Sequence, residues 1–255
     1  MDRVNRMSAQ RNDVAESARI CGRALMSRRG NVTKLILAFM FCITCAVLCM
    51  FTLDAISVYF LPDRLKDGAA VLNLALTVAV YSVADLWLLR LGVRAGQGRI
   101  ELFDLGNRGN GSGFSSSVAA VLGVVAEIAI AAILHAYLEI FSPYVSRVLG
   151  QAVNGLCTLL TSFLVGVAFF HISTGLFFLG AVSEREKRGP FSLIALSFRA
   201  ARGNRAKIVK FVLSFALLTF LSLFSLGVFF FVYVLPLYIL SYGAFTSEVL
   251  DYKEC

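Results

Sequence analysis

Five ionisable side chains lie within long apolar stretches of this sequence, where a charge is costly. Glu127 falls near the middle of one stretch, His135 and Glu139 follow it in the same stretch, and Asp85 and His171 fall in two others. In lipid such groups usually face a cavity or bind a partner. Glu127 could hold a proton or a cation, or it could accept a hydrogen bond from Ser, Thr or His171 on a neighbouring helix. Glu127 and His171 are therefore the candidate substrate or ion site.

The remaining reactive residue types form no recognisable site. His135 and Glu139 are one helical turn apart and could supply two metal ligands, but a metal site generally needs three or four. We interpret them as a polar pair at the membrane interface. The sequence contains no His-Glu-x-x-His zinc helix, no Gly-x-Ser-x-Gly elbow and no P-loop. We predict no catalytic residue, no metal site and no cofactor.

The apolar stretches indicate an integral membrane protein. Hydrophobic residues make up 58% of the 255 residues, whereas soluble domains carry about 45–50%. The last stretch, Ile208–Thr246, contains a single charge, Lys210. As one helix it would be about 58 Å long, roughly twice the hydrocarbon core of a bilayer. We therefore expect this stretch to cross the membrane twice, reversing near Ser225-Leu226-Gly227.

The sequence predicts an all-α fold, a polytopic bundle of transmembrane helices. A basic cytoplasmic segment with an amphipathic helix (1–34) precedes the bundle (35–246), and a short acidic tail (247–255) follows it. Five spans are the alternative, if the last stretch is one helix kinked before Pro236. The six expected spans are Leu35–Phe60, Ala69–Leu91, Val118–Phe141, Ala152–Val182, Ile208–Ser225 and Gly227–Thr246.

The distribution of basic residues predicts the orientation. Nearly all of the 24 Lys and Arg residues lie in the N-terminal segment, in the second-to-third and fourth-to-fifth connectors with their flanking span ends, or in the tail. The exceptions are Arg64, Lys66 and Arg147. Loops rich in Lys and Arg remain on the cytoplasmic side of a membrane. We expect a multi-pass protein of the bacterial cytoplasmic membrane with a cytoplasmic N-terminus.

The tripeptide Arg-Gly-Asn occurs three times on the predicted cytoplasmic side, at Arg29-Gly30-Asn31, Arg108-Gly109-Asn110 and Arg202-Gly203-Asn204. The segments before the first and third copies have helical apolar faces, typical of short amphipathic helices at a membrane interface. The first face holds Val14, Ala18, Cys21 and Leu25, and the third holds Phe191, Ile194, Phe198 and Ala201.

These copies are interpreted as joints between an interfacial helix and a span. Gly30 and Gly203 would take the left-handed position that ends the first helix, and Asn31 and Asn204 would cap the span that follows. Arg29, Arg202 and Lys207 would contact anionic lipid phosphates, each contributing about 1 kcal/mol near the surface. The alternative interpretation is that these segments are only basic loops.

The C-terminal region resembles a family of bacterial polytopic membrane proteins that is catalogued as a domain of unknown function, mostly from Gram-positive bacteria. The resemblance rests on the basic joint at Arg202-Gly203-Asn204, the turn at Ser225-Leu226-Gly227 and Pro236-Leu237-Tyr238 in the last span. Arg205 stands where an aromatic residue is common in that family. The resemblance covers about the last quarter of the chain and implies a six-helix bundle without established chemistry.

Three classes of function are compatible with these features. We favour a non-enzymatic membrane protein that binds lipids or partners, or acts as a scaffold, because the basic joints are the most repeated feature. Its expected partners are anionic lipids and either a helix-packing membrane protein or a second copy, with no nucleic acid. A small transporter or permease component with its site at Glu127 and His171 is the first alternative. An enzyme acting on lipid headgroups is the second, although no acid, base and nucleophile converge in the sequence.

Overall fold

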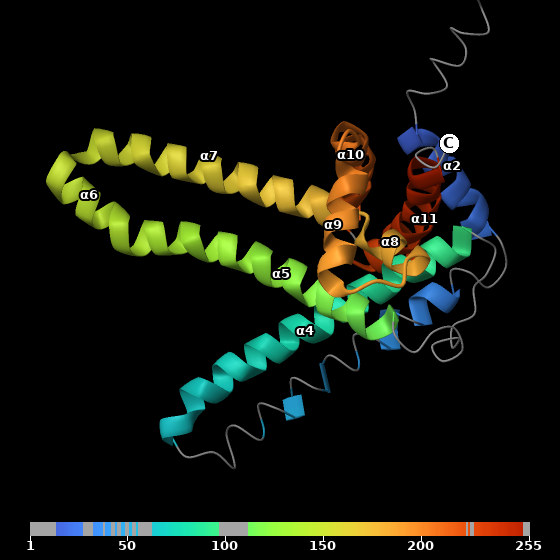
Figure 1. Ribbon diagram of the computed structural model, residues 1–255, viewed down its shortest axis with the longest axis horizontal. Helices are drawn as coiled ribbons and strands as arrows, with labels where there is room; N and C mark the ends of the chain where they lie inside the picture. The colour runs from blue at the N-terminus through green and yellow to red at the C-terminus, as the bar shows by residue number, and fades with distance from the viewer. Residues whose placement is uncertain are drawn as a thin grey trace, which may run out of the picture.

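The computed structural model is helical throughout the residues that it describes, which are 14–27, 63–96, 112–222 and 227–251, together with short pieces between 33 and 55 and residue 224 (Figure 1). The all-α prediction is confirmed for these residues. The first and second Arg-Gly-Asn joints, including Arg29, Gly30 and Asn31, lie outside them, as does most of the predicted first span. The helices are α2 (Val14–Ser27), α4 (Asp63–Gly96), α5 (Ser112–Ala136), α6 (Ser142–Leu149), α7 (Gln151–Leu176), α8 (Leu179–Arg185), α9 (Pro190–Ala201), α10 (Arg205–Ser222) and α11 (Leu235–Asp251).

Four helical stretches in the described part of the chain are long and apolar enough to cross a membrane. They match the predicted second, third, fourth and sixth spans. The predicted fifth span forms α10, a helix of 18 residues that begins with three basic residues in its first six. The four stretches are Asn73–Ala95, Gly113–Leu149, Gln151–Arg185 and Phe230–Leu250.

The chain reverses direction at two glycines with positive φ. Gly150 (φ 87°) separates α6 from α7, and Gly227 (φ 83°) separates α10 from α11. Phe211 of α10 contacts Phe245, with ring centroids 4.7 Å apart, and Phe215 contacts Tyr238 at 5.2 Å. The contacts advance along α10 while they go back along α11, so the two helices run antiparallel. The predicted reversal near Gly227 is therefore confirmed, and a single helix kinked before Pro236 does not form.

Each proline inside a long helix follows a π-helical turn. The turn Tyr137–Phe141 precedes Pro143, and the turn Phe230–Val234 precedes Pro236. Proline lacks an N–H and its ring clashes with the carbonyl four residues earlier. In both cases the carbonyl four residues before the proline belongs to the π-helical turn. In such a turn the usual α-helical hydrogen bond is already replaced by one that spans five residues. This arrangement lets the third apolar stretch continue as helix to Leu149, well beyond its predicted end at Phe141.

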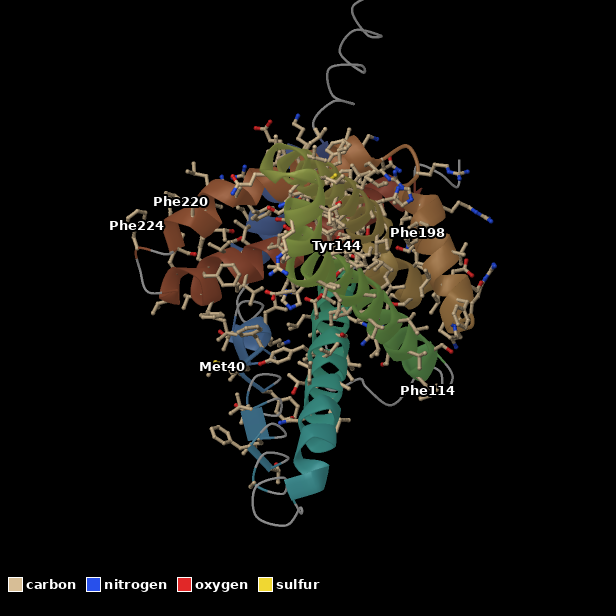
Figure 2. All side chains as sticks on the ribbon, turned by 90° about the vertical axis from the view of Figure 1, so that its left-hand side faces the viewer. Met40, Phe114, Tyr144, Phe198, Phe220 and Phe224 are labelled. Atoms are coloured by element: carbon tan, nitrogen blue, oxygen red, sulfur yellow. The ribbon has the colours of Figure 1, made fainter. Side chains whose placement is uncertain are left out.

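The buried core lies at one end of the molecule, around α11. Its largest fully buried side chains include Tyr242, Phe178, Phe211 and Phe245. From this packed end three arms diverge: the first half of α4, the α5–α7 hairpin, and the α10–α11 hairpin, which carries Phe220 and Phe224 at its outer end (Figures 1 and 2). The arms do not close into the compact bundle that the sequence suggested, and the outer part of α7 exposes large apolar side chains such as Leu159 and Phe163.

Three consecutive residues of α11 contact three different helices at the packed end. Ser241 meets Gly22 of α2, where an added Cβ would lie 2.1 Å from the serine oxygen. Tyr242 donates a 2.7 Å hydrogen bond to the carbonyl of Phe177 between α7 and α8. Gly243 meets Gly92 of α4, and a Cβ on Gly243 would lie 2.0 Å from the Gly92 carbonyl oxygen. Backbones approach this closely only where side chains are small.

The predicted amphipathic helices exist, but their buried faces differ from those expected. In α2, Val14, Ala18 and Leu25 are buried as predicted, whereas Gly22 is buried in place of Cys21, which is exposed. The physical reason is that α2 packs on α11, with Gly22 at the crossing. The apolar face of α2 is therefore covered by protein, and not by lipid as the sequence suggested.

The face of α9 is rotated by about one residue from the prediction. Ala201 is buried as expected, but Phe191 is 75% exposed, and Leu193, Ser197 and Ala200 take the buried positions. The small residues face inward because α9 packs closely on α7, where Ser197 donates a 2.6 Å hydrogen bond to a main-chain carbonyl.

Replacing Gly243 with Ala should destabilise the protein by about 1–3 kcal/mol, because the new methyl group would overlap the Gly92 carbonyl and push α4 from α11. The matched control is Gly166→Ala in the exposed part of α7, where an added Cβ meets nothing within 4 Å. That change should be neutral or stabilising by up to about 1 kcal/mol. Thermal unfolding in detergent measures both, and equal midpoints for the two variants would contradict the packing described here.

Candidate functional site

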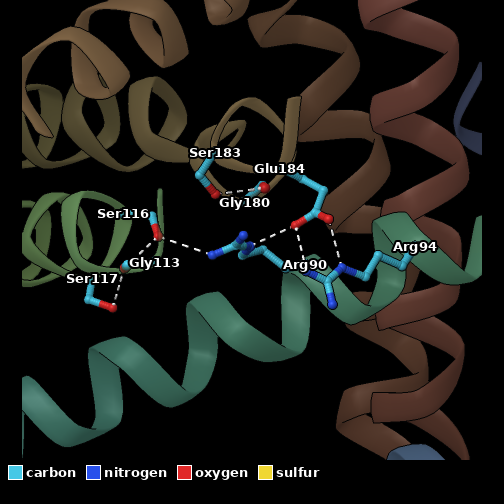
Figure 3. A network of polar contacts seen from close by, with 8 residues as sticks. All are labelled: Arg90, Arg94, Gly113, Ser116, Ser117, Gly180, Ser183 and Glu184. Atoms are coloured by element: carbon cyan, nitrogen blue, oxygen red, sulfur yellow. Dashed lines mark hydrogen bonds and ion pairs between the residues drawn. The ribbon is translucent and has the colours of Figure 1, made fainter. Parts of the chain in front are cut away.

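Two arginines and one glutamate join three helices at the packed end (Figure 3). Arg90 Nε lies 2.8 Å from Glu184 Oε2, and Arg94 Nε lies 2.7 Å from Glu184 Oε1. Arg90 Nη1 also donates to Ser116 Oγ at 3.1 Å, and that hydroxyl donates to the carbonyl of Gly113 at 2.9 Å. The network therefore fixes the end of α4 to the start of α5 and to α8.

This network retains one net positive charge, since two guanidinium groups share one carboxylate. The side chains of Arg90 and Glu184 are only 16% and 17% exposed, so solvent screens the pair weakly. Neither Glu184 nor Ser116 was predicted from the sequence as a site residue. The spacing of Arg90 and Arg94, four residues apart on one helix, is the signal that predicts a shared anionic partner.

Glu127 occupies the contact between α5 and α7. Ser173 Oγ donates a 2.6 Å hydrogen bond to Glu127 Oε1. One turn earlier on α5, Gly123 lies against Leu176 of α7, so the two helices approach closely here. Asp85 of α4 is near enough for the two carboxylates to interact electrostatically. The hydrogen-bonding alternative predicted for Glu127 is thus observed, with serine as the donor.

His171 faces away from Glu127. It precedes Ser173 by two residues on α7, which is about 200° around a helix. Its Nε2 lies 3.0 Å from Nη2 of Arg205, the first residue of α10, and its ring lies 5.9 Å from that of Phe198 in α9. The structure therefore gives the two residues of the candidate ion site separate partners on different helices.

The third joint has the predicted left-handed glycine. Gly203 has φ 83°, and the exposed residues Arg202 and Lys207 lie on either side of it. Asn204 is buried, and its side-chain amide donates a 3.0 Å hydrogen bond to the carbonyl of Ala200. This amide thus binds the end of α9, whereas the sequence analysis expected Asn204 to cap the start of α10. The difference arises because the tight turn folds Asn204 back over the last carbonyls of α9.

Helix α9 holds the joint against α7. Ser197 Oγ donates to the carbonyl of Gly175 at 2.6 Å, and the ring of Phe198 fills the space beside Gly175, where an added Cβ would lie 2.4 Å from a ring carbon. His171, one turn before Gly175, contacts the same ring. The joint, the start of α10 and the last turns of α7 therefore form one packed unit.

Within the described ranges, no group of three or more His, Cys, Asp or Glu side chains could hold a metal ion. His135 and Glu139 are both exposed, near the outer end of the α5–α7 hairpin. Comparisons with protein-family models, curated proteins and solved structures found no match to this chain. The resemblance of the C-terminal region to a family of bacterial membrane proteins therefore stays a prediction.

Replacing Glu184 with Gln should destabilise the protein by about 1–3 kcal/mol, because Arg90 and Arg94 would lose their shared anion in a partly buried site. The exposed pair of Arg188 and Glu186 offers a matched control, with side chains 52% and 46% exposed. Glu186→Gln should change stability by less than about 0.5 kcal/mol. The two variants are compared by thermal unfolding in detergent. A similar loss in both would show that the network does not join the helices.

Replacing Gly203 with Val should cost about 1–2 kcal/mol, because a β-branched residue resists positive φ. Gly189→Val is the control, since Gly189 has an ordinary φ of −67° and both positions leave 4 Å of free space for a Cβ. Only the backbone conformation distinguishes the two sites. Folded yield and unfolding temperature measure the difference, and equal tolerance would contradict the assigned role of Gly203.

Proposed function

We propose that this chain is a non-enzymatic, multi-pass protein of the bacterial cytoplasmic membrane whose basic, packed end binds anionic lipids and serves as a scaffold. One observation supports this most strongly. The helix ends that flank the basic segments meet at a single packed end, while long apolar arms extend from it (Figure 1). A basic surface beside apolar helices is the arrangement that contacts anionic headgroups.

The placement of the helix ends supports the proposed orientation. The last turns of α4, the first turns of α5, the end of α7 with α8, and the first turns of α10 all contribute buried residues to the packed end. In the chain, these ends flank the connectors with most of the Lys and Arg residues. A cytoplasmic N-terminus and six spans would therefore put those basic connectors on one side of the membrane.

Exposed basic groups at the third joint supply the proposed lipid contacts. Arg202 and Lys207 are exposed on either side of the left-handed turn. Each would contribute about 1 kcal/mol in contact with anionic lipid near the surface. The diverging arms also leave apolar faces of α5 and α7 for lipid, for a helix-packing membrane partner or for a second copy of the chain.

A transporter or permease component is the second candidate, and one observation favours it. Glu127, deep in the third apolar stretch, accepts a hydrogen bond from Ser173 and lies near enough to Asp85 for the two carboxyl groups to interact. A carboxylate in this setting can be a proton or cation site. We favour a packing role, because the hydrogen bond to Ser173 joins α5 to α7 where the helices already approach closely at Gly123.

The proposed function predicts that the purified protein binds phosphatidylglycerol more tightly than phosphatidylcholine. The double variant Arg202→Gln, Lys207→Gln should lose about thirtyfold in affinity for phosphatidylglycerol and little for phosphatidylcholine, because two headgroup charges lose their partners. Titration of fluorescent lipids into the protein in uncharged detergent measures this. Equal binding of the two lipids by the wild type would contradict the proposal.

Two substitutions at Glu127 separate the two candidate functions. If the residue packs the helices, Glu127→Gln should change stability little, and Glu127→Leu should cost about 0.6–2 kcal/mol through the lost interhelical hydrogen bond. The measurements are thermal stability in detergent and proton flux in proteoliposomes. A wild-type flux that disappears in the Gln variant at unchanged stability would favour the transporter instead.

A further inference from the structure

Arg205 is a cation for which the structure shows no carboxylate partner. Its Nη2 lies 3.0 Å from His171 Nε2, and its Nε is buried without a hydrogen-bond partner among the described residues. Three other arginines of the described residues do have carboxylate partners: Arg90 and Arg94 share Glu184, and Arg188 binds Glu186. Because arginine stays protonated in proteins, a guanidinium in this position can bind an anion that the described residues do not supply.

The surroundings of Arg205 indicate which anion would bind. Arg205 begins α10 directly after the third joint and is partly exposed, and the neighbouring Arg202 and Lys207 are exposed cations. Guanidinium groups bind phosphate oxygens through short, charge-assisted hydrogen bonds. At the end of an apolar helix, the phosphate with the highest local concentration is that of a lipid headgroup.

His171 makes this site sensitive to protons. The Arg205 guanidinium can only donate, so a hydrogen bond between the two groups requires an unprotonated His171 Nε2 as the acceptor. Protonation would turn Nε2 into a donor and place two cations 3.0 Å apart. The direct bond would then break, and both groups could donate to oxygens of one phosphate. Histidine is the side chain whose charge commonly changes between about pH 5 and 8.

The other charged groups on the elements packed against α7 do not replace this contact. On α5, the carboxylate of Glu127 accepts from Ser173, on the opposite side of α7. On α9, Arg199 follows the Phe198 that covers the His171 ring. On α6, Arg147 lies toward the other end of α7. Arg205 of α10 is the charged group in contact with the ring in the described part of the chain.

We propose that Arg205 and His171 form a proton-dependent site for the phosphodiester of an anionic lipid headgroup. This inference rests on the proposed lipid-binding function and assigns it a specific pair of residues and a pH dependence. The bound lipid favours the protonated ring, so affinity rises as the pH falls through the range in which His171 gains its proton and declines as the pH rises.

The test uses the full-length protein in uncharged detergent with fluorescent phosphatidylglycerol, whose phosphodiester keeps one negative charge over the range used. Between about pH 7.5 and 5.5 the wild type should gain about fivefold in affinity, the effect of one added charge. His171→Gln should remove the pH dependence, with His171→Asn as a second neutral variant. Arg205→Gln should weaken binding at both pH values, and Arg188→Gln, an exposed paired arginine, should behave like the wild type.

The outcomes separate this site from the proposed function. Absence of any preference for phosphatidylglycerol over phosphatidylcholine would overturn both. A preference that is unchanged by pH, or unchanged in Arg205→Gln, would overturn the site and leave the lipid-binding function standing. In a third experiment, inorganic phosphate is added as a competitor of the bound lipid. If phosphate displaces the lipid at concentrations similar to those of the lipid, free phosphate is the ligand and the assignment to lipid is overturned. Unfolding temperatures without lipid confirm that each variant is folded.

Discussion

The close contact of α11 with three other helices is the constraint on which the rest of the structure depends. Successive residues of a helix point about 100° apart, and Ser241, Tyr242 and Gly243 use this spacing to meet α2, the α7–α8 junction and α4. The contact of Ser241 with Gly22 and the contact of Gly243 with Gly92 each require a glycine on at least one of the two helices that meet there. A larger side chain there would separate α4 or α2 from α11 and expose the aromatic core around Phe211 and Phe245. The packed end forms because the helices cross this closely, and the polar contacts described above depend on that packing.

The polar contacts then determine how the connectors sit on that packed end. Glu184 joins α8 to α4, and Ser197 joins α9 to α7, so the short segment between α8 and α9 is held from both sides. The left-handed turn at Gly203 directs α10 back toward the core, which brings Arg205 to His171. The basic residues are thereby gathered next to apolar arms that need lipid or another protein to cover them. This combination of a rigid basic end and exposed apolar arms is what the proposed scaffold requires.

Much of this fold could be predicted from single positions in the sequence, and the rest depends on pairs of helices. Long apolar stretches predicted the helical class and six spans, of which four are found as apolar helices of membrane length in the described residues. The left-handed turn at Gly203 and a reversal of the chain near Gly227 were also predicted. The face of α2 was predicted incorrectly because Gly22, which has no side chain to count as apolar, is buried by its contact with Ser241. The helix through Pro143 was missed because π-helical turns have no local sequence signal. Glu127 was singled out as a polar residue in an apolar stretch, but neither its partner Ser173 nor the pairing of His171 with Arg205 could be deduced without knowing which helices touch.

The central claim is that the basic helix ends gather on the cytoplasmic side while the far end of the α5–α7 hairpin lies outside. The most direct measurement labels single cysteines in intact cells with a membrane-impermeant reagent, in a variant without the native cysteines. Gln151→Cys, exposed at the far end of the hairpin, should be labelled. Glu186→Cys, at the packed end where the native side chain is 46% exposed, should be labelled only after the membrane is permeabilised. Labelling of Glu186→Cys in intact cells would contradict the account.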